Sequence, residues 1–415
     1  MDRPRDVAVI GAGIVGACCA GWLQRKGMDV TLIERNAPGE ATSFGNAGSL
    51  SPTAVLPVAM PGMIRQIPGW LLDPLGPLTV RWSYLPRALP WLLRFLRRAN
   101  AEAMWETANS LRPLLRPLFE CYEPLVERAE VKELIRREGI IYLYDSEADF
   151  RASKRAEDMR RKLGAVLEDL SAADIQRMVP GLSSAFKWGT YAPENGFTTN
   201  PARLARAIVD SVVARGGSLV KAETTDIVPR RDGKLMVQTS AGELLADAVV
   251  VSAGAWSHRL TARLGDRIPL ETQRGYHVTV ANPGVQPGRM VNWVLPRVYA
   301  TPMEMGMRFA GTVEIAGLDA APNWARADAL LRLGKRLYPD MDTSSVSRWM
   351  GHRPCLPDSM PVIGPSPRAA NVYYAFGHGH VGMCGAPGTG RTIAELVAGE
   401  KPQVDITPFR PERFE

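Results

Sequence analysis

Long apolar runs, paired cysteines and a strong charge imbalance are all missing from this chain of 415 residues. No stretch of about 18 uncharged apolar residues occurs, so no membrane-spanning helix is expected. The five cysteines are scattered without a CxxC pair, which argues against a disulfide framework or a zinc site and is typical of a reducing cytoplasm. The net charge of +7 is modest. It is compatible with an anionic substrate or an acidic membrane surface, but it does not by itself indicate nucleic acid.

The N-terminus also lacks the apolar region and cleavage site of a signal peptide, because residues 1–6 are followed only by a short apolar run and a glycine turn. The composition is ordinary for a globular protein, with 46% apolar and 22% charged residues. At about 100–200 residues per domain, the length predicts one large or two moderate domains.

The first 34 residues have the order strand, glycine turn, helix, strand. The β-branched run at 6–10 leads into the motif GAGIVG, and a second run at 29–34 ends in an acid. In a dinucleotide-binding fold the three glycines permit the tight turn, the approach of a pyrophosphate and close helix packing. The acid, Glu34, can bind ribose hydroxyls and disfavours NADP. The predicted cofactor contacts here are Gly11, Gly13, Ile14, Val15, Gly16, Glu34 and Arg35.

The same fold holds NAD or FAD. The stretch that follows, 35–51, is polar and rich in glycine where an NAD dehydrogenase normally begins its next crossover helix. Such a loop suits a ligand that extends beyond the pyrophosphate, as FAD does.

Three distant segments complete the pattern. A buried run at 246–251 ends in a small-residue turn that includes Gly254, which leaves room for a close approach of backbone or ligand. Arg353 lies among prolines and can form a bidentate pair with a substrate carboxylate; the alternative is a surface arginine paired with Asp358. The glycine-rich turn at 377–385 leads from a strand into a helix and aims backbone N–H groups at an electron-rich atom.

His378 and His380 form an HxH pair without carboxylate or cysteine neighbours. This pattern is weak evidence for a metal, so no metal site is predicted, and packing or polar contact with a cofactor is favoured.

In this order the motifs resemble those of the FAD-dependent D-amino acid oxidase/dehydrogenase superfamily, which includes glycine oxidase and sarcosine oxidase. The resemblance covers nearly the whole chain. It is strongest to bacterial D-amino acid dehydrogenases and to glyphosate oxidoreductase, which shares the segments 70–77, 274–277, 300–306, 311–314 and 321–324.

The resemblance implies an α/β fold in which a Rossmann-like, doubly wound FAD-binding domain is interleaved with an α+β substrate domain on a mixed sheet. The FAD domain is expected to comprise 1–55, 168–260 and 346–415. The substrate domain is expected to comprise 56–167 and 261–345, including a helical insertion at 55–135 that is rich in Pro, Trp and Arg.

The resemblance also assigns site residues. Arg353 is expected to hold the substrate carboxylate and Tyr276 to lie over the flavin, where it can contact the substrate. The FAD is expected to be noncovalent, since the cysteine motif of the sarcosine oxidase branch is missing and Cys355 falls in the arginine loop. The further FAD contacts implied are Ser43, Asn46, Gly48, Gly254, His380, Val381, Gly382 and Met383.

The implied reaction is hydride transfer from the substrate Cα–H to flavin N5. It gives a 2-oxo acid and ammonia from a D-amino acid, with the electrons passed to a quinone or another acceptor. Secondary amines such as D-hydroxyproline, sarcosine or a glyphosate-like compound are the alternative substrates. A flavin-binding subunit without catalysis and an NAD-linked dehydrogenase are the alternatives from other classes.

Residues 81–98 contain five arginines and no acid, together with Trp, Phe and Leu. Such a segment can lie in a bilayer interface and deliver electrons to a membrane quinone. The alternative is a helical subdomain packed on the FAD domain with solvated arginines. We therefore expect a cytoplasmic protein, with peripheral attachment to the inner face of the membrane as the alternative.

Overall fold

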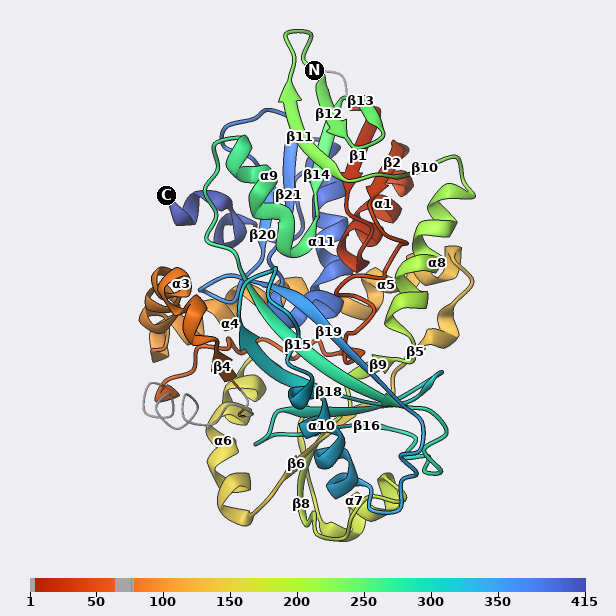
Figure 1. The fold of residues 1–415 in the computed structure, drawn as a ribbon, viewed down its shortest axis with the longest axis vertical. Coiled ribbons are helices and arrows are strands. Elements are labelled where there is room, and N and C mark those ends of the chain that lie inside the picture. Colours follow the sequence, from red (N-terminus) through yellow and green to blue (C-terminus); the bar gives the residue numbers. More distant parts are fainter. Residues whose placement is uncertain (1–3, 64–75, 77) are drawn as a thin grey trace.

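The computed structural model describes residues 4–63, 76 and 78–415. The shared segment at 70–77 therefore lies, except for Gly76, outside the described residues. Two large sheets organise the rest of the chain, one above the other in Figure 1.

The first sheet has six strands in the order β10-β2-β1-β14-β21-β20. All its neighbouring strands are parallel except β20, which runs antiparallel to β21. Its inner strands are continuous apolar runs, as expected for a sheet buried on both faces. The strands are β1 (Asp6–Ile10), β2 (Asp29–Glu34), β10 (Ser218–Lys221), β14 (Ala248–Val251), β20 (Val362–Pro365) and β21 (Val372–Phe376).

The two faces of this sheet are covered differently. Helices α1 (Ile14–Arg25), α8 (Pro201–Val213) and α11 (Gly382–Val397) share one hydrophobic core with Val7, Val9 and Val250. The other face packs on a three-stranded antiparallel sheet and on α9 (Ser257–Arg263). The second cover is therefore mainly a sheet, where a doubly wound fold was expected. Its strands are β11 (Thr224–Pro229), β12 (Leu235–Thr239) and β13 (Gly242–Ala246).

The second large sheet is mixed, with the order β19-β15-β18-β17-β16-β6-β8-β7 and β4 paired to β18. One face packs on α10 (Trp324–Leu337) and α7 (Ala172–Met178), and part of the other packs on α6 (Glu147–Lys162). Its strands are β4 (Leu78–Val80), β6 (Ile140–Tyr144), β7 (Glu168–Leu170), β8 (Trp188–Ala192), β15 (Glu271–Val280), β16 (Met290–Trp293), β17 (Val298–Met303), β18 (Gly306–Ile315) and β19 (Val346–Cys355).

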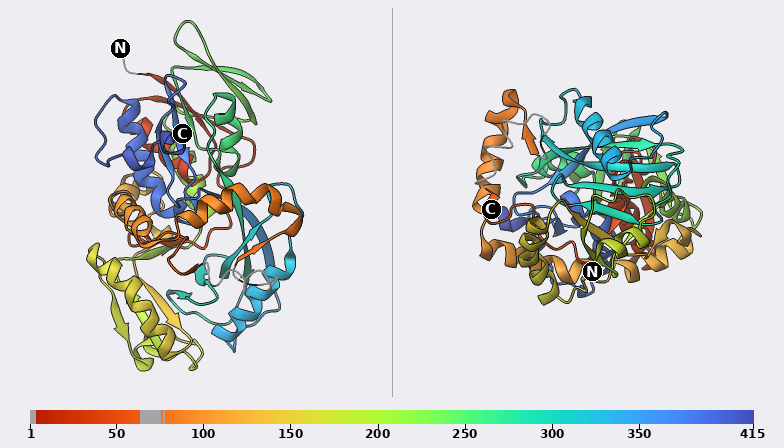
Figure 2. Two further views of the ribbon diagram at one scale, coloured as in Figure 1. Left: turned by 90° about the vertical axis from the view of Figure 1, so that its left-hand side faces the viewer. Right: turned by 90° about the horizontal axis from the view of Figure 1, so that it is seen from below.

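The remaining elements connect the two sheets. A small sheet joins β3 (Ser49–Leu50), β9 (Gly196–Thr198) and β5 (Ile135–Arg136). Figures 1 and 2 show α3 (Leu85–Arg97) at the outside of the molecule. The other helices are α4 (Ala101–Leu115), α5 (Leu118–Arg128) and the short 3-10 turns η2 (Trp82–Tyr84), η3 (Lys132–Leu134), η4 (Gly254–Trp256), η5 (Gly379–Val381), η6 (Thr407–Phe409) and η7 (Pro411–Phe414).

The expected α/β fold with a mixed second sheet is confirmed, but the sheets divide the chain differently from the expected boundaries. β7 and β8 pair with β6 in the mixed sheet, although 168–260 was assigned to the FAD domain. β19 lies beside β15 along its whole length, so the mixed sheet extends to Cys355. Within the insertion at 55–135, α4 and α5 pack into the same core as α1 and α11, which agrees with a helical subdomain.

Candidate active site

The glycine turn after β1 is pressed against the end of β14. Gly11 has a positive φ of 99°, and a Cβ there would lie 2.6 Å from the carbonyl oxygen of Ser252. The Ser252 hydroxyl donates a 2.8 Å hydrogen bond to the carbonyl of Ile10. A Cβ at Gly16 would overlap the Gly11 carbonyl, so Gly16 serves the packing of helix on turn. These contacts leave the start of α1 facing a cavity.

Glu34 is fixed by the backbone at the end of β2. Its Oε2 accepts a 2.8 Å hydrogen bond from the Ala12 N–H, and its Oε1 accepts one of 3.0 Å from Asn36. The Ser43 hydroxyl accepts from the Ile14 N–H at 3.0 Å and so ties the following loop to the first turn of α1. The carboxylate is thereby oriented beside the glycine turn, as a ribose-binding acid must be.

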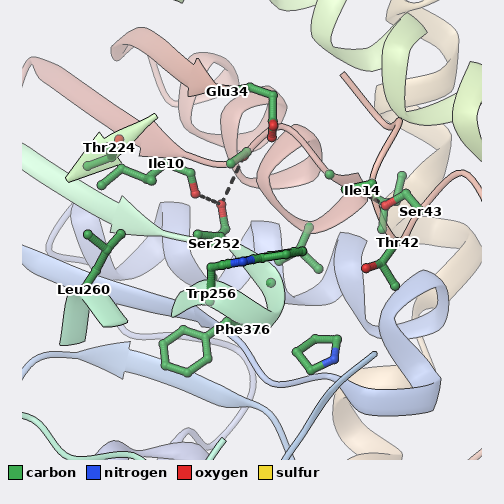
Figure 3. A pocket seen from close by; sticks show the side chains of 18 of the residues that line it. Ile10, Ile14, Glu34, Thr42, Ser43, Thr224, Ser252, Trp256, Leu260 and Phe376 are labelled. Atoms are coloured by element: carbon green, nitrogen blue, oxygen red, sulfur yellow. Dashed lines mark hydrogen bonds between the residues drawn. The ribbon is translucent and has the colours of Figure 1, made fainter. Parts of the chain in front are cut away.

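A cavity of about 340 Å³ runs along these groups (Figure 3). Three segments line it: the N-terminal turn with its loop, the stretch around β11 and η4, and the turn before α11. The predicted cofactor residues that line it are Gly11, Gly13, Ile14, Val15, Glu34, Arg35, Ser43, Asn46, Gly254, Gly382 and Met383. Gly16, Gly48, His380 and Val381 are not among the lining residues.

Other lining residues were not foreseen, because they come from segments without a motif. The Arg35 guanidinium lies 4.0 Å from the centre of the Trp256 ring, beside Glu34. Thr224 and Phe376 also line the cavity (Figure 3). The only sequence signal for Trp256 was its place two residues after Gly254.

The cavity fits an extended dinucleotide. An acid and an aromatic ring lie at one end, the helix start with its glycines in the middle, and the glycine-rich turn before α11 at the other end. Gly13 keeps the middle open, since a Cβ there would lie 3.3 Å from the Ser43 hydroxyl oxygen. The N-terminal end of α11 carries a partial positive charge that suits an electron-rich ring edge. These residues are suited to hold FAD.

The mixed sheet lies across the far end of this site, and three of its side chains bind the loop at 44–47. His277 Nδ1 lies 3.1 Å from the Gly45 carbonyl, and the Thr301 hydroxyl donates to Ala47 at 2.7 Å. Arg308 donates to the carbonyls of Phe44 and Asn46 at 2.8 and 2.9 Å. We call the side of the sheet that carries these three side chains the cofactor-facing side.

Arg353 lies on this side of the sheet. In the β15–β19 ladder Arg353 faces Gln273 and Gly351 faces Gly275, and both pairs share the face of His277. The Arg353 guanidinium lies flat on Gly275, where a Cβ would come within 2.5 Å of Nη1. Nη1 donates a 3.0 Å hydrogen bond to the Thr312 carbonyl. Burial lowers the pKa of Arg353 from its usual value.

The Thr312 carbonyl is available because β18 contains a bulge. Arg274 pairs with Glu314, but Tyr276 pairs with Gly311, so β18 has one extra residue opposite Gly275. Thr312 has a positive φ of 56°, which is unusual for a β-branched residue. The alternative partner considered for Arg353 is engaged elsewhere, because Asp358 accepts a 2.8 Å hydrogen bond from Arg413.

His380 lies between the turn before α11 and the mixed sheet. Its Nε2 donates a 2.9 Å hydrogen bond to the Gln273 side-chain oxygen. Burial lowers the pKa of His380 well below its usual value, and the charges of Arg353 and Arg297 lower it further. His378 contacts the Thr389 hydroxyl at 2.9 Å. In the described part of the chain no three metal-ligating side chains gather in one group.

Tyr276 is not on the cofactor-facing side, because successive strand residues point to opposite faces. Its hydroxyl donates to Glu314 at 2.5 Å and accepts from the Asn323 N–H at 2.9 Å. Its ring belongs to the core beneath α10. Tyr299 is in the cross-strand row of His277 and is the tyrosine that shares its face.

Comparisons with known proteins agree with this geometry. The chain is 42% identical to D-amino-acid oxidase of Bradyrhizobium diazoefficiens over 421 aligned positions that cover 100% of both chains. It is 31% identical to D-amino acid dehydrogenase of Paramagnetospirillum magneticum, over 98% of each chain. The crystal structure of glycine oxidase from Geobacillus kaustophilus superposes with a TM-score of 0.73 and 23% identity, and the match covers 99% of this chain and 98% of that one.

The family described as "DAO: FAD dependent oxidoreductase" matches residues 6–396. This match includes the glycine turn, the arginine loop and the turn before α11. The predicted resemblance and the predicted cofactor, FAD, are thereby confirmed. The chain belongs to the DAO family of FAD-dependent oxidoreductases.

Proposed function

We propose that the chain oxidises D-amino acids to imino acids, which water hydrolyses to 2-oxo acids and ammonia. When bound, FAD supplies the hydride acceptor. The full-length similarity to a D-amino-acid oxidase and to D-amino acid dehydrogenases supports this substrate class. The observation that carries the proposal is the placement of Arg353 on the cofactor-facing side, beside the turn that precedes α11.

Arg353 binds the substrate carboxylate in this proposal. Its guanidinium is oriented by the Thr312 carbonyl on one edge and by the flat surface of Gly275 beneath. The planar fork retains N–H groups for a carboxylate, which it can bind through two parallel hydrogen bonds. Fixing the carboxylate restricts the substrate to orientations in which the Cα–H bond points toward the ring.

The substrate amine must be neutral to release its electron pair. Arg353 and Arg297 both act on His380, so two positive charges lie near the site. Positive charges lower the pKa of a nearby amine and favour its neutral form. His380 is itself held neutral, and no side-chain base is required.

Tyr299 takes the role that was expected of Tyr276. It shares the row of His277 on the cofactor-facing side, whereas the Tyr276 hydroxyl is bound to Glu314 on the opposite side. Burial is the main cause that raises the pKa of Tyr299, so its hydroxyl stays protonated and can donate a hydrogen bond.

The FAD is held without a covalent bond. The described residues that line the cavity include no cysteine. Cys355 and Cys384 are both buried, and burial raises the pKa of each thiol to about 12 and about 11, which keeps them unreactive. Precipitation with acid should release the flavin into the supernatant, and flavin that stays with the protein would contradict a noncovalent cofactor.

The acceptor of the electrons is a membrane quinone, reached through attachment of α3 to an anionic membrane. The inner side of α3 buries Ala88, Trp91 and Phe95, whereas Leu89 and Leu93 are 47% and 49% exposed. Trp82, just before the helix, is 67% exposed. The exposed arginines of the helix are Arg87, Arg94 and Arg97. Apolar side chains among arginines suit a bilayer surface with negative headgroups. Within the described residues no helix has the length and hydropathy to cross a membrane.

The substrate proposal is tested by anaerobic reduction of the flavin. The purified holoenzyme is mixed with D-alanine, D-glutamate, glycine, sarcosine, D-hydroxyproline or glyphosate, and the loss of oxidised-flavin absorbance is followed. Reduction by primary D-amino acids is expected. Reduction by secondary amines alone would replace the proposal with the alternative substrate class, and no reduction by any compound would refute it.

The membrane proposal is tested by flotation with vesicles. Vesicles of phosphatidylcholine with phosphatidylglycerol should carry the protein at low salt, and vesicles of phosphatidylcholine alone should not. The double substitution Leu89→Glu and Leu93→Glu should abolish flotation without loss of flavin. The matched control is Leu219→Glu and Leu245→Glu, which changes exposed leucines on the opposite domain. Equal flotation of both variants would contradict attachment through α3.

A further inference from the structure

A second arginine lies beside Arg353. β17 begins at Val298, and its ladder pairs Tyr299 with Ala310, so the preceding residue, Arg297, lies beside the bulge of β18. The Arg297 carbonyl lies 2.7 Å from the position of a Cβ on Gly311. The Arg353 guanidinium donates to the carbonyls of Gly311 and Thr312, at 3.5 and 3.0 Å. The two arginines therefore flank the same two residues of β18.

Arg297 has an unusual backbone conformation. Its φ is +56°, and its N–H donates a 3.2 Å hydrogen bond to the Val294 carbonyl, which closes the turn between β16 and β17. A left-handed conformation costs a residue other than glycine about 1–3 kcal/mol. Such conformations cluster at functional sites, where the surrounding structure holds a side chain in a required place.

The Arg297 side chain lies in a concave, partly desolvated region. The residue is exposed, yet burial lowers its pKa from the usual value, which together describe a side chain within a cleft. Arg297 and Arg353 are the two charges that lower the pKa of His380 after burial. His380 binds Gln273 on the cofactor-facing side, so both guanidinium charges act on the same region of the site.

The neighbouring acids are engaged elsewhere. Glu314 faces the opposite side of the sheet, where it accepts a hydrogen bond from Tyr276 and lies 3.7 Å from Arg274. Glu271 accepts hydrogen bonds from the Tyr84 hydroxyl and from the Thr272 N–H. Neither carboxylate is placed against Arg353, and the region around His380 is left with an excess of positive charge.

We propose that Arg297 binds a second anionic group of the substrate, so that D-amino acids with an acidic side chain are preferred over their neutral isosteres. The inference rests on the proposed function, in which Arg353 holds the α-carboxylate. With one guanidinium for each acidic group, D-glutamate and D-aspartate are the substrate class that uses both. A neutral side chain would leave the Arg297 charge in a desolvated region without an anion from the substrate.

The test compares D-glutamate with D-glutamine, which has the same shape and no side-chain charge. The ratio of their kcat/KM values is measured by anaerobic flavin reduction for the wild type, Arg297→Gln and Arg297→Lys. The wild type should favour D-glutamate by about tenfold or more, since a charge-assisted hydrogen bond is lost with D-glutamine. Arg297→Gln should bring the ratio near one, and Arg297→Lys should retain most of the preference. Arg336→Gln, which removes a charge from exposed α10, is the matched control and should leave the ratio unchanged.

Equal turnover of the two amino acids by the wild type, or an unchanged ratio in Arg297→Gln, would overturn the inference. A binding measurement separates this failure from failure of the proposed function. Glutarate and its monoamide are titrated against the holoenzyme, and the shift of the flavin spectrum is followed. If no amino acid reduces the flavin, tighter binding of glutarate that is lost in Arg297→Gln still supports the anion site. Equal binding of the two compounds refutes it.

Discussion

The substitution Gly275→Ala tests whether Arg353 is the substrate anchor without changing any residue proposed to contact the substrate. The new Cβ would lie 2.5 Å from Arg353 Nη1, where ordinary contact requires about 3.5 Å. The guanidinium must therefore move by about 1 Å or leave the Thr312 carbonyl. A misplacement of about 1 Å at a substrate-positioning group costs about a hundredfold in rate, so kcat/KM should fall by about that factor.

The assay combines kcat/KM for a D-amino acid with the flavin content of the purified protein. Gly275 does not line the cofactor cavity, so the FAD content should stay that of the wild type. The control is Gly189→Ala, a strand glycine of the same sheet whose added Cβ would meet only the mobile end of Ile175, at 3.1 Å. This variant should keep its activity.

A double-mutant cycle shows whether the effect passes through Arg353. If Gly275→Ala acts by displacing the guanidinium, it should add little to the loss already caused by Arg353→Met. Full additivity of the two losses would refute the reasoning, as would a kcat/KM of Gly275→Ala within about threefold of the wild type.

Three further changes have distinct expected outcomes. Arg353→Met should lower kcat/KM by about a hundredfold or more through the lost bidentate pair while the FAD content is unchanged, and unchanged turnover would contradict a carboxylate anchor. Tyr276→Phe should lower the free energy of unfolding by about 1–3 kcal/mol, since Glu314 loses a donor, and should change kcat/KM less than Tyr299→Phe does; the opposite order in kinetic assays would reverse the roles of the two tyrosines. His277 and His378 are buried and their pKa values are lowered to about 3, so only the unfolded chain binds protons there as the pH falls below about 6.5, and the free energy of unfolding should decrease by about 2.7 kcal/mol per pH unit from the two together. Urea denaturation of the holoenzyme at a series of pH values measures this slope, which should fall by about half in His378→Gln and should not stay the same.

Local chemistry made the cofactor end of the chain predictable. The tight turn requires glycine, the helix start follows directly, and an acid at the end of the second strand is needed for ribose binding, so the spacing from Gly11 to Glu34 is itself a signature. Arg353 was recognisable because it is an isolated cation among prolines near the end of the chain. These signals do not depend on how the distant segments pack.

The substrate end depended on information that no single segment contains. Tyr276 and Tyr299 are both strand tyrosines, and only the ladder with its bulge in β18 reveals that they face opposite sides. Arg297 carries no motif, and its place follows from a turn conformation that favours glycine. The membership of β7 and β8 in the mixed sheet is likewise decided by pairing with β6, not by their short sequences. Tertiary pairing therefore determined what the pattern of residues left open.

The central position of β1 in its sheet has a consequence for the order of folding. β1 lies between β2, its neighbour in the chain, and β14, and the hydrogen bond that joins Ile10 to Ser252 spans 242 positions. During synthesis β1 therefore has one exposed, apolar edge until most of the chain has been made. Contacts of such high sequence separation form slowly, and we expect chaperones or early flavin binding to determine the yield of active protein in cells.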